Sequence, residues 1–255
     1  MTTGARPLSD FCFLNLMTPD GEAAKAFFAK VLGWTYGAMP GVPGGTLVLV
    51  DGKTAGAIMD LDKSQMPPGT PPVIGVMIRV EDADRTVAMV RELGGKADAP
   101  MNALENGRMA LCSDPNGGMF GIWQAMKEVG FECDSHAEGA PTWFETHTSD
   151  PDKAVPFYTK LFGWRATAQD MGTMVYTVFH LGDRPIAGGM KRMAESVPSH
   201  WGTYFAVKNC DDTVTRAKAA GAEVCMPPTD IPNVGRFALL RSPQGVMFHV
   251  LTYTV

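Results

Sequence analysis

The stretch FFAKVLGW at residues 27–34 returns as FYTKLFGW at residues 157–164, 130 positions further along the chain. In the first copy the apolar residues recur at three- and four-residue spacing, so they share one face of a helix. Asp20 and Asp150 precede the two copies at the same offset and can cap the helices, and a glycine follows each last turn. The repeated stretch therefore predicts one amphipathic helix in each half of the chain.

The repetition extends beyond this helix. The turn DPNG at 114–117 returns as SPQG at 242–245, 128 positions later. The same features in the same order and at nearly the same spacing predict two homologous domains, residues 9–125 and 140–254. The segment between them, 126–139, is polar and contains glycines, which is typical of a linker.

Each predicted domain is itself doubled. An extended apolar segment, an acidic residue and a helix that ends at glycine occur at 11–33 and again at 73–94. Short runs rich in Val, Leu, Ile and Phe follow each helix and are separated by turn residues, as strands are. One helix for four strands is too few for a doubly wound parallel sheet. We predict an α+β fold in which four βαβββ modules form two curved, mixed or antiparallel sheets, with the helices on one face.

Composition excludes several classes of protein. The 255 residues are 45% hydrophobic and 19% charged, as in ordinary globular proteins, and the formal net charge is −5. No basic face is available for nucleic acid, and no apolar run approaches the roughly 18 residues that span a bilayer. The amino terminus lacks the basic and apolar blocks of a signal peptide, which predicts a cytoplasmic protein. Five scattered cysteines without a C-x-x-C pair predict reduced thiols.

This organisation resembles the vicinal oxygen chelate superfamily, which includes glyoxalases, bleomycin-resistance proteins and extradiol dioxygenases. The resemblance rests on the FYTKLFGW segment and on the closing GRFALLRSPQGVMFHVL at 235–251. The segments SHWGTYFAV at 199–207 and DIPNVGRFALL at 230–240 are similar to a two-domain actinobacterial branch of glyoxalase-like proteins, some of them labelled hydroxylases. The resemblance implies that each domain forms a U-shaped cup. In metal-using members the cup holds a metal through four His, Glu or Gln side chains, one on each of four strands.

Few donor atoms stand at the positions of those ligands. In the first and second domain respectively, the first ligand position holds Phe13 and Trp143, and the third holds Gly75 and Gly202. The last position holds Gly121 in the first domain and His249 in the second. The remaining ligand falls within 55–60 or 186–190, where Asp60 is the one candidate donor. All five histidines lie in the second half of the chain, although transition metals favour imidazole or thiolate ligands. We therefore predict cups without a metal ligand set and without a cofactor.

An alternative metal site remains open in the second domain. Glu145, His200 and His249 converge if the ligand positions are shifted along their strands by two residues, about 7 Å. Such a centre would hold one divalent metal and differ from the one that the family implies.

The candidate site residues follow from the same alignment of strands. Glu145 and His249 are the candidate catalytic residues. A carboxylate in an apolar cup has a raised pKa and can act as a general base, while the imidazole stabilises an oxyanion. The candidate ligand-binding residues supply rings for stacking and polar anchors: Phe13, Asn15, Trp123, Trp143, His147, His200 and Tyr204.

These residues predict a protein that binds a small carbonyl-bearing or aromatic metabolite in metal-free cups, with or without metal-independent isomerase or lyase chemistry. Three rivals stay open: a metal-free glyoxalase-like enzyme, a metal-dependent glyoxalase or dioxygenase, and a protein-interaction role. Fold resemblance alone does not choose among them. The tandem repeat predicts either a monomer that acts as an internal pseudo-dimer or a homodimer.

Overall fold

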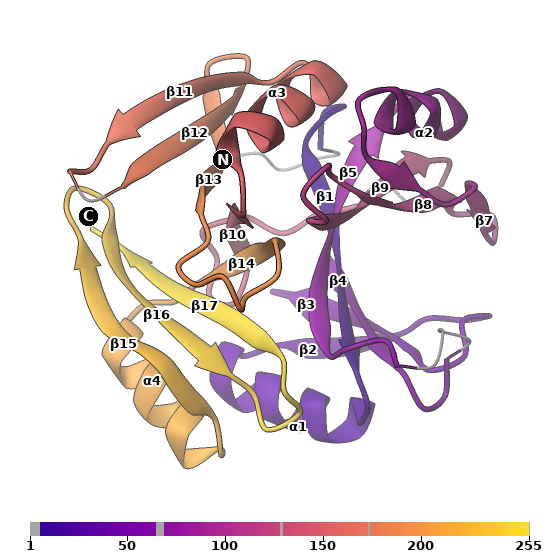
Figure 1. The fold of residues 1–255 in the computed structure, drawn as a ribbon. Helices are drawn as coiled ribbons and strands as arrows, with labels where there is room; N and C mark the ends of the chain where they lie inside the picture. The colour runs from indigo at the N-terminus through magenta and orange to yellow at the C-terminus, as the bar shows by residue number, and fades with distance from the viewer. Residues whose placement is uncertain (1–5, 65–68, 128–129, 173, 255) are drawn as a thin grey trace.

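The computed structural model describes residues 6–64, 69–127, 130–172 and 174–254. It contains two curled mixed sheets with helices packed beside them (Figure 1). The helices are α1 (Gly21–Leu32), α2 (Ala83–Glu92), α3 (Pro151–Phe162) and α4 (Cys210–Ala219). Within the described residues no helix is both long enough and apolar enough to cross a membrane.

The first sheet has the strand order β2-β3-β4-β1-β5-β9-β8-β6, with β7 beside β8. Its strands are β1 (Phe11–Thr18), β2 (Thr35–Ala38), β3 (Gly45–Val50), β4 (Lys53–Asp60), β5 (Val73–Val80), β6 (Lys96–Ala97), β7 (Met101–Ala103), β8 (Gly107–Ser113) and β9 (Met119–Ala125). At the centre β1 and β5 are antiparallel, whereas β1–β4 and β5–β9 are parallel pairs. The sheet is therefore two strand–helix–three-strand modules joined through their first strands.

The second sheet repeats this arrangement in the order β11-β12-β13-β10-β14-β17-β16-β15. Its strands are β10 (Pro141–Thr148), β11 (Arg165–Asp170), β12 (Val175–Leu181), β13 (Arg184–Lys191), β14 (His200–Ala206), β15 (Glu223–Ile231), β16 (Gly235–Arg241) and β17 (Met247–Tyr253). The predicted α+β fold of two curved mixed sheets is confirmed. Residues 128 and 129 of the predicted linker lie outside the described residues.

The repeated helices begin and end where their sequence predicts. The Asp20 side chain accepts a hydrogen bond from the Ala23 amide, and the Asp150 side chain accepts one from Asp152. Gly33 and Gly163 close α1 and α3 in the left-handed conformation, with φ values of 72° and 69°. Glycine is the residue that adopts this conformation at least cost.

The two sheets pack back to back. Phe11 on β1 stacks on Phe144 on β10, with ring centroids 4.1 Å apart, and both belong to one buried core shared by the two domains. Side chains alternate along a strand, so Glu145, next to Phe144, points to the opposite face. In Figure 1 the outer strands of each sheet bend away from the other domain. The faces directed away from the shared core are therefore the concave ones.

Two indole groups form hydrogen bonds between the halves of the chain. Trp34 donates a hydrogen bond from Nε1 to the Gly139 carbonyl (2.8 Å), and Trp164 donates one to the Ser9 carbonyl (2.7 Å). Each indole follows one helix of the repeated pair. Equivalent tryptophans thus each bond the chain just before the first strand of the other domain.

We predict that Phe11→Ala lowers the free energy of unfolding by about 3–5 kcal/mol, because a buried phenylalanine is lost from the shared core. The two domains should still unfold in one transition in urea, followed by tryptophan fluorescence and circular dichroism. The control Leu8→Ala, at a side chain that is 46% exposed, should change the free energy by less than about 0.5 kcal/mol. Two separate transitions in the wild-type protein would contradict the shared core.

Candidate functional site

The concave face of the second sheet carries a cluster of ionisable side chains at its centre. Glu145 on β10 is in register with Gly202 on β14 and with Gly188 on β13. Two residues along β14, Tyr204 is in register with His249 on β17. The two strand pairs therefore bring a carboxylate, a phenol and an imidazole together from distant parts of the sequence.

Three groups surround the Glu145 carboxylate. Tyr176 donates a hydrogen bond to Oε2 (2.6 Å), and Tyr204 donates one to Oε1 (2.9 Å). His147 Nε2 also lies 2.9 Å from Oε1, at ion-pair distance but without the alignment of a hydrogen bond. Glu145 itself is only 5% exposed. These partners hold the buried carboxylate in one orientation, and their hydrogen bonds replace those that it would form with water.

The pKa of Glu145 is lowered in the folded protein. Burial alone would raise it, but the neighbouring His147 and the hydrogen bond from Tyr176 outweigh the burial. A raised pKa was expected for a carboxylate in an apolar cup, and that expectation is wrong because the surroundings of Glu145 are polar. Glu145 is therefore ionised at neutral pH and is a weak proton acceptor.

Tyr176 is the site residue that sequence reasoning missed. It comes from β12 near the sheet edge, and its hydroxyl also accepts a hydrogen bond from Trp143 Nε1 (3.0 Å). A Cβ atom at Gly188 would overlap the Tyr176 hydroxyl. Glycine inside a strand often marks such a close approach, so Gly188 is the sequence signal for this contact.

His249 lies against Tyr204 in the floor of the site. The two rings stack with centroids 4.1 Å apart, and a Cβ atom at Gly202 would come within 3.0 Å of the imidazole. Burial lowers the pKa of His249 from 6.5 to about 4, although the charge of Glu145 opposes the shift. Its buried Nδ1 has no aligned hydrogen-bond partner among the described residues, although the Thr203 backbone is near. Nδ1 of His249 therefore faces the β14 backbone, and the imidazole is neutral at pH 7.

The histidine rings are arranged for stacking. His147 lies parallel to His200 at 4.8 Å and parallel to His249 at 6.3 Å. His200 Nδ1 is 2.9 Å from the Pro198 carbonyl, and burial lowers the pKa of His200. Rings that face one another direct their nitrogens along parallel planes, whereas metal ligands direct their lone pairs at one centre.

The side chains present therefore do not fit the metal that metal-using glyoxalases and dioxygenases hold. Each oxygen of Glu145 already accepts a tyrosine hydroxyl. In the described part of the chain, no three His, Cys, Asp or Glu side chains are grouped so that they could hold a metal ion. The absence of a cofactor stays a prediction.

The structure divides the predicted site residues between the two sheets. In the second sheet it brings together Glu145, His249, Trp143, His147, His200 and Tyr204. In the first sheet Phe13 and Trp123 belong to a separate apolar cluster, and Asn15 contacts Met77 in that cluster. The predicted residues therefore fall into two clusters of different chemistry, one on each sheet.

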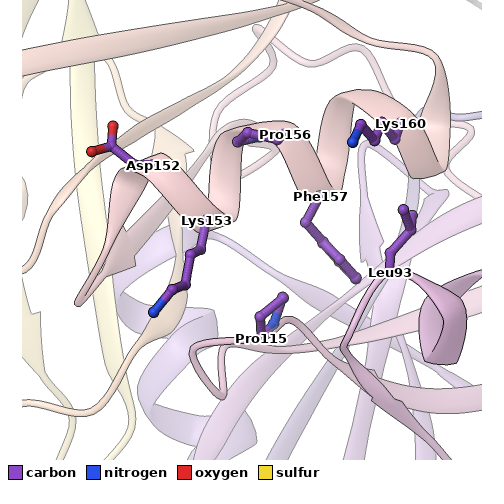
Figure 2. A pocket seen from close by; sticks show the side chains of 7 residues that line it. All are labelled: Leu93, Pro115, Asp152, Lys153, Pro156, Phe157 and Lys160. Atoms are coloured by element: carbon purple, nitrogen blue, oxygen red, sulfur yellow. The ribbon is translucent and has the colours of Figure 1, made fainter.

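A cavity of about 270 Å³ lies elsewhere, where α3 meets the turn between β8 and β9 (Figure 2). Its lining residues are Leu93, Pro115, Asp152, Lys153, Pro156, Phe157 and Lys160. The charged side chains there are exposed. Because exposed charges have ordinary reactivity, we place the candidate chemistry in the concave face of the second sheet instead.

This fold, with a polar cluster at the centre of a curled sheet, has known relatives. The family model for the Glyoxalase/Bleomycin resistance protein/Dioxygenase superfamily matches residues 11–122 and again residues 142–250. The chain belongs to this superfamily, with one family domain in each half.

Two curated relatives match nearly the whole chain. "Putative glyoxylase CFP32" of Mycobacterium tuberculosis is 36% identical over 245 residues, covering 94% of this chain and 93% of that protein. "Anthracycline biosynthesis protein DnrV" of Streptomyces peucetius is 32% identical over 253 residues, covering 94% and 91%.

Solved structures share the fold at low identity. The Mn(II)-bound glyoxalase from Novosphingobium aromaticivorans has a TM-score of 0.65 and 17% identity, over 96% of this chain and 82% of its own. The substrate complex of homoprotocatechuate 2,3-dioxygenase from Brevibacterium fuscum has a TM-score of 0.66 and 14% identity, over 100% and 83%. At this identity the likeness shows the fold alone.

We predict that Tyr176→Phe raises the pKa of Glu145, because the variant removes a hydrogen bond that favours the ionised carboxylate. It should also lower the free energy of unfolding by about 1–3 kcal/mol. Carboxyl NMR shifts against pH and urea unfolding measure the two effects. Tyr36→Phe, which loses a hydroxyl bonded to the Lys25 carbonyl, is the matched control and should leave the Glu145 titration unchanged.

The lowered pKa of His249 makes stability depend on pH. The unfolded chain binds this proton more readily than the folded chain, so the free energy of unfolding should fall as pH drops from about 6.5 to 4. The loss from this group approaches about 3 kcal/mol. His249→Phe keeps a ring against Tyr204 but cannot titrate, so its slope over this range should be smaller. An unchanged slope in His249→Phe, or a reduced slope in the exposed-site control His136→Gln, would refute the assignment.

Proposed function

We propose that this protein binds a small aromatic or carbonyl-bearing metabolite on the concave face of its second domain. The observation that carries the proposal is the buried cluster of Glu145, Tyr176, Tyr204 and His249 at the centre of a curled sheet. A few polar groups gathered among rings in a concave face are typical of a small-molecule site.

The chemistry of the cluster favours binding. Because burial keeps His249 neutral at pH 7, its imidazole can donate one hydrogen bond to a ligand carbonyl without carrying a charge. The stacked rings of His147 and His200 stand beside the cluster and add aromatic groups that an aromatic ligand can contact. Glu145 acts as a positioning residue, because its ionised carboxylate fixes the hydroxyls of Tyr176 and Tyr204.

The names of the relatives support the same class of ligand. One is named a putative glyoxylase and another an anthracycline biosynthesis protein. A neutral imidazole among aromatic rings is suited to a ligand with a carbonyl group and a flat ring system. A small conjugated molecule with at least one carbonyl oxygen is therefore the ligand class that we propose.

An isomerase or lyase reaction in the same site is a second candidate function. Glu145 on β10 and His249 on β17 lie on the two strands that flank β14. They differ in charge state at neutral pH, as a base and an oxyanion-stabilising donor would. The lowered pKa of Glu145 makes it a weak base, so we rank binding above turnover.

The test uses alizarin, a flat dihydroxyanthraquinone, and calorimetric titration of the full chain. We expect saturable binding, with affinity reduced at least tenfold in His249→Phe, as the loss of one hydrogen bond of about 1.4 kcal/mol requires. His180→Phe, outside the cluster, is the control and should bind like the wild type.

Two companion measurements separate the rivals. Turnover of the hemithioacetal of methylglyoxal and glutathione, lost in Glu145→Gln while alizarin binding is retained, would favour the metal-free enzyme. Elemental analysis that finds one divalent metal per chain, removed by Glu145→Gln, would favour the metalloenzyme. If wild-type protein binds alizarin no better than His249→Phe, the proposed site is wrong.

A further inference from the structure

The concave face of the first sheet differs chemically from that of the second at three matched positions. Asn15 is in register with Ala57 and Gly75, as Glu145 is with Gly188 and Gly202. Met77 is in register with Gly121, at the place where Tyr204 meets His249. The carboxylate, the phenol and the imidazole of the second domain thus correspond here to an amide, a thioether and an empty side-chain position.

An apolar cluster fills this face and is separate from the core between the domains. Its buried members are Cys12, Phe13, Ala57, Met77 and Trp123, with Met39, Leu47, Ala103, Met109 and Ala125 packed around them. Phe13 is 9% exposed and Trp123 is 8% exposed. Methionine side chains are unbranched and flexible, so a cluster rich in methionine can change shape at low cost.

Met77 occupies the centre of this cluster. Its side chain lies over Gly121, where a Cβ atom would come within 3.1 Å of Cγ and 3.2 Å of Cε. Asn15 donates a hydrogen bond from Nδ2 to the Met77 sulfur at 3.1 Å. A thioether is a weak acceptor, so the amide is paired with a poor substitute for a carbonyl oxygen. Met77 therefore fills a space in which a ligand with a better acceptor would be preferred.

Two hairpin tips meet across the mouth of this face. Gly41, between β2 and β3, lies so close to Leu104, between β7 and β8, that a Cβ on Gly41 would be 3.0 Å from Leu104 Cδ1. These tips belong to opposite edges of the sheet, so they can touch only across its concave side. The contact closes the cluster from outside.

Leu104 is an unfavourable residue for this turn. It has a φ of 53° and is 53% exposed, so a branched apolar side chain is held in the left-handed region and in water. The matching turn of the second domain holds Asn233 at a φ of 62°, and asparagine tolerates that conformation. The Leu104 side chain instead contacts the loop at Gly41 beside the apolar cluster.

We propose that the first domain is a second binding site, separate from the cluster around Glu145, for an uncharged planar aromatic molecule with one carbonyl acceptor. The ligand displaces the Met77 side chain, its ring packs between Phe13 and Trp123, and its carbonyl accepts the Asn15 amide hydrogen. Leu104 and the loop at Gly41 separate to admit it. The apolar side chains of the cluster favour an uncharged ligand.

The test compares indanone, which has a carbonyl, with indane, which lacks it, on the full chain with isotope-labelled methionine methyl groups. We expect indanone to shift the NMR signal of the Met77 methyl. Asn15→Leu, which is close to isosteric, should weaken indanone binding at least tenfold and leave indane binding unchanged. Met77→Ala should strengthen indanone binding, because the side chain to be displaced is gone.

Further variants distinguish this site from that of the second domain. His249→Phe should leave indanone binding unchanged, and Asn15→Leu should leave alizarin binding unchanged. Leu104→Asn, which preserves the turn, should speed indanone dissociation. The proposal is overturned if indanone, up to its solubility limit, leaves the Met77 methyl signal of the wild type unmoved and binds Met77→Ala no more tightly than the wild type. It is also overturned if binding follows His249 rather than Asn15.

Discussion

The packing of the two sheets back to back governs the rest of this structure. Stacking of Phe11 on Phe144 commits one face of each central strand to a single core, and strand alternation then sends the next side chain to the other face. The concave faces therefore carry residues that the core does not need. A polar cluster can develop on one of them without weakening the packing that holds the domains together.

Within the second domain the decisive constraint is the cost of burying a carboxylate. Glu145 is tolerated because Tyr176, Tyr204 and His147 replace the water it loses. Two glycines make that arrangement possible: Gly188 gives room to the Tyr176 hydroxyl and Gly202 to the His249 ring. In this chain the absence of side chains at two strand positions is as important as the polar groups themselves.

The two domains show how one architecture supports two chemistries. Strand register places Asn15 and Glu145 at equivalent positions of the two sheets. The side chains around each of them determine its chemistry. Around Glu145 the neighbours are hydroxyls and imidazoles that keep it ionised. Around Asn15 they are methionines and aromatic rings, which leave one amide in an apolar environment. Duplication preserved the strand order and left the concave faces free to diverge.

The sequence by itself determined the repeated modules, the capped helices and the faces on which Glu145, His147 and His249 would lie, because helix and strand periodicity are local properties. It also indicated that rings and glycines stand at the expected ligand positions. Only the tertiary structure decided that Tyr176 from an outer strand completes the Glu145 cluster, and that its hydrogen bonds lower the carboxylate pKa rather than raise it. It likewise decided that Met77 lies at the centre of the apolar cluster of the first domain and that Leu104 contacts Gly41. Those outcomes depend on strand register and sheet curvature, which set distances between residues far apart in the chain and cannot be read from local periodicity.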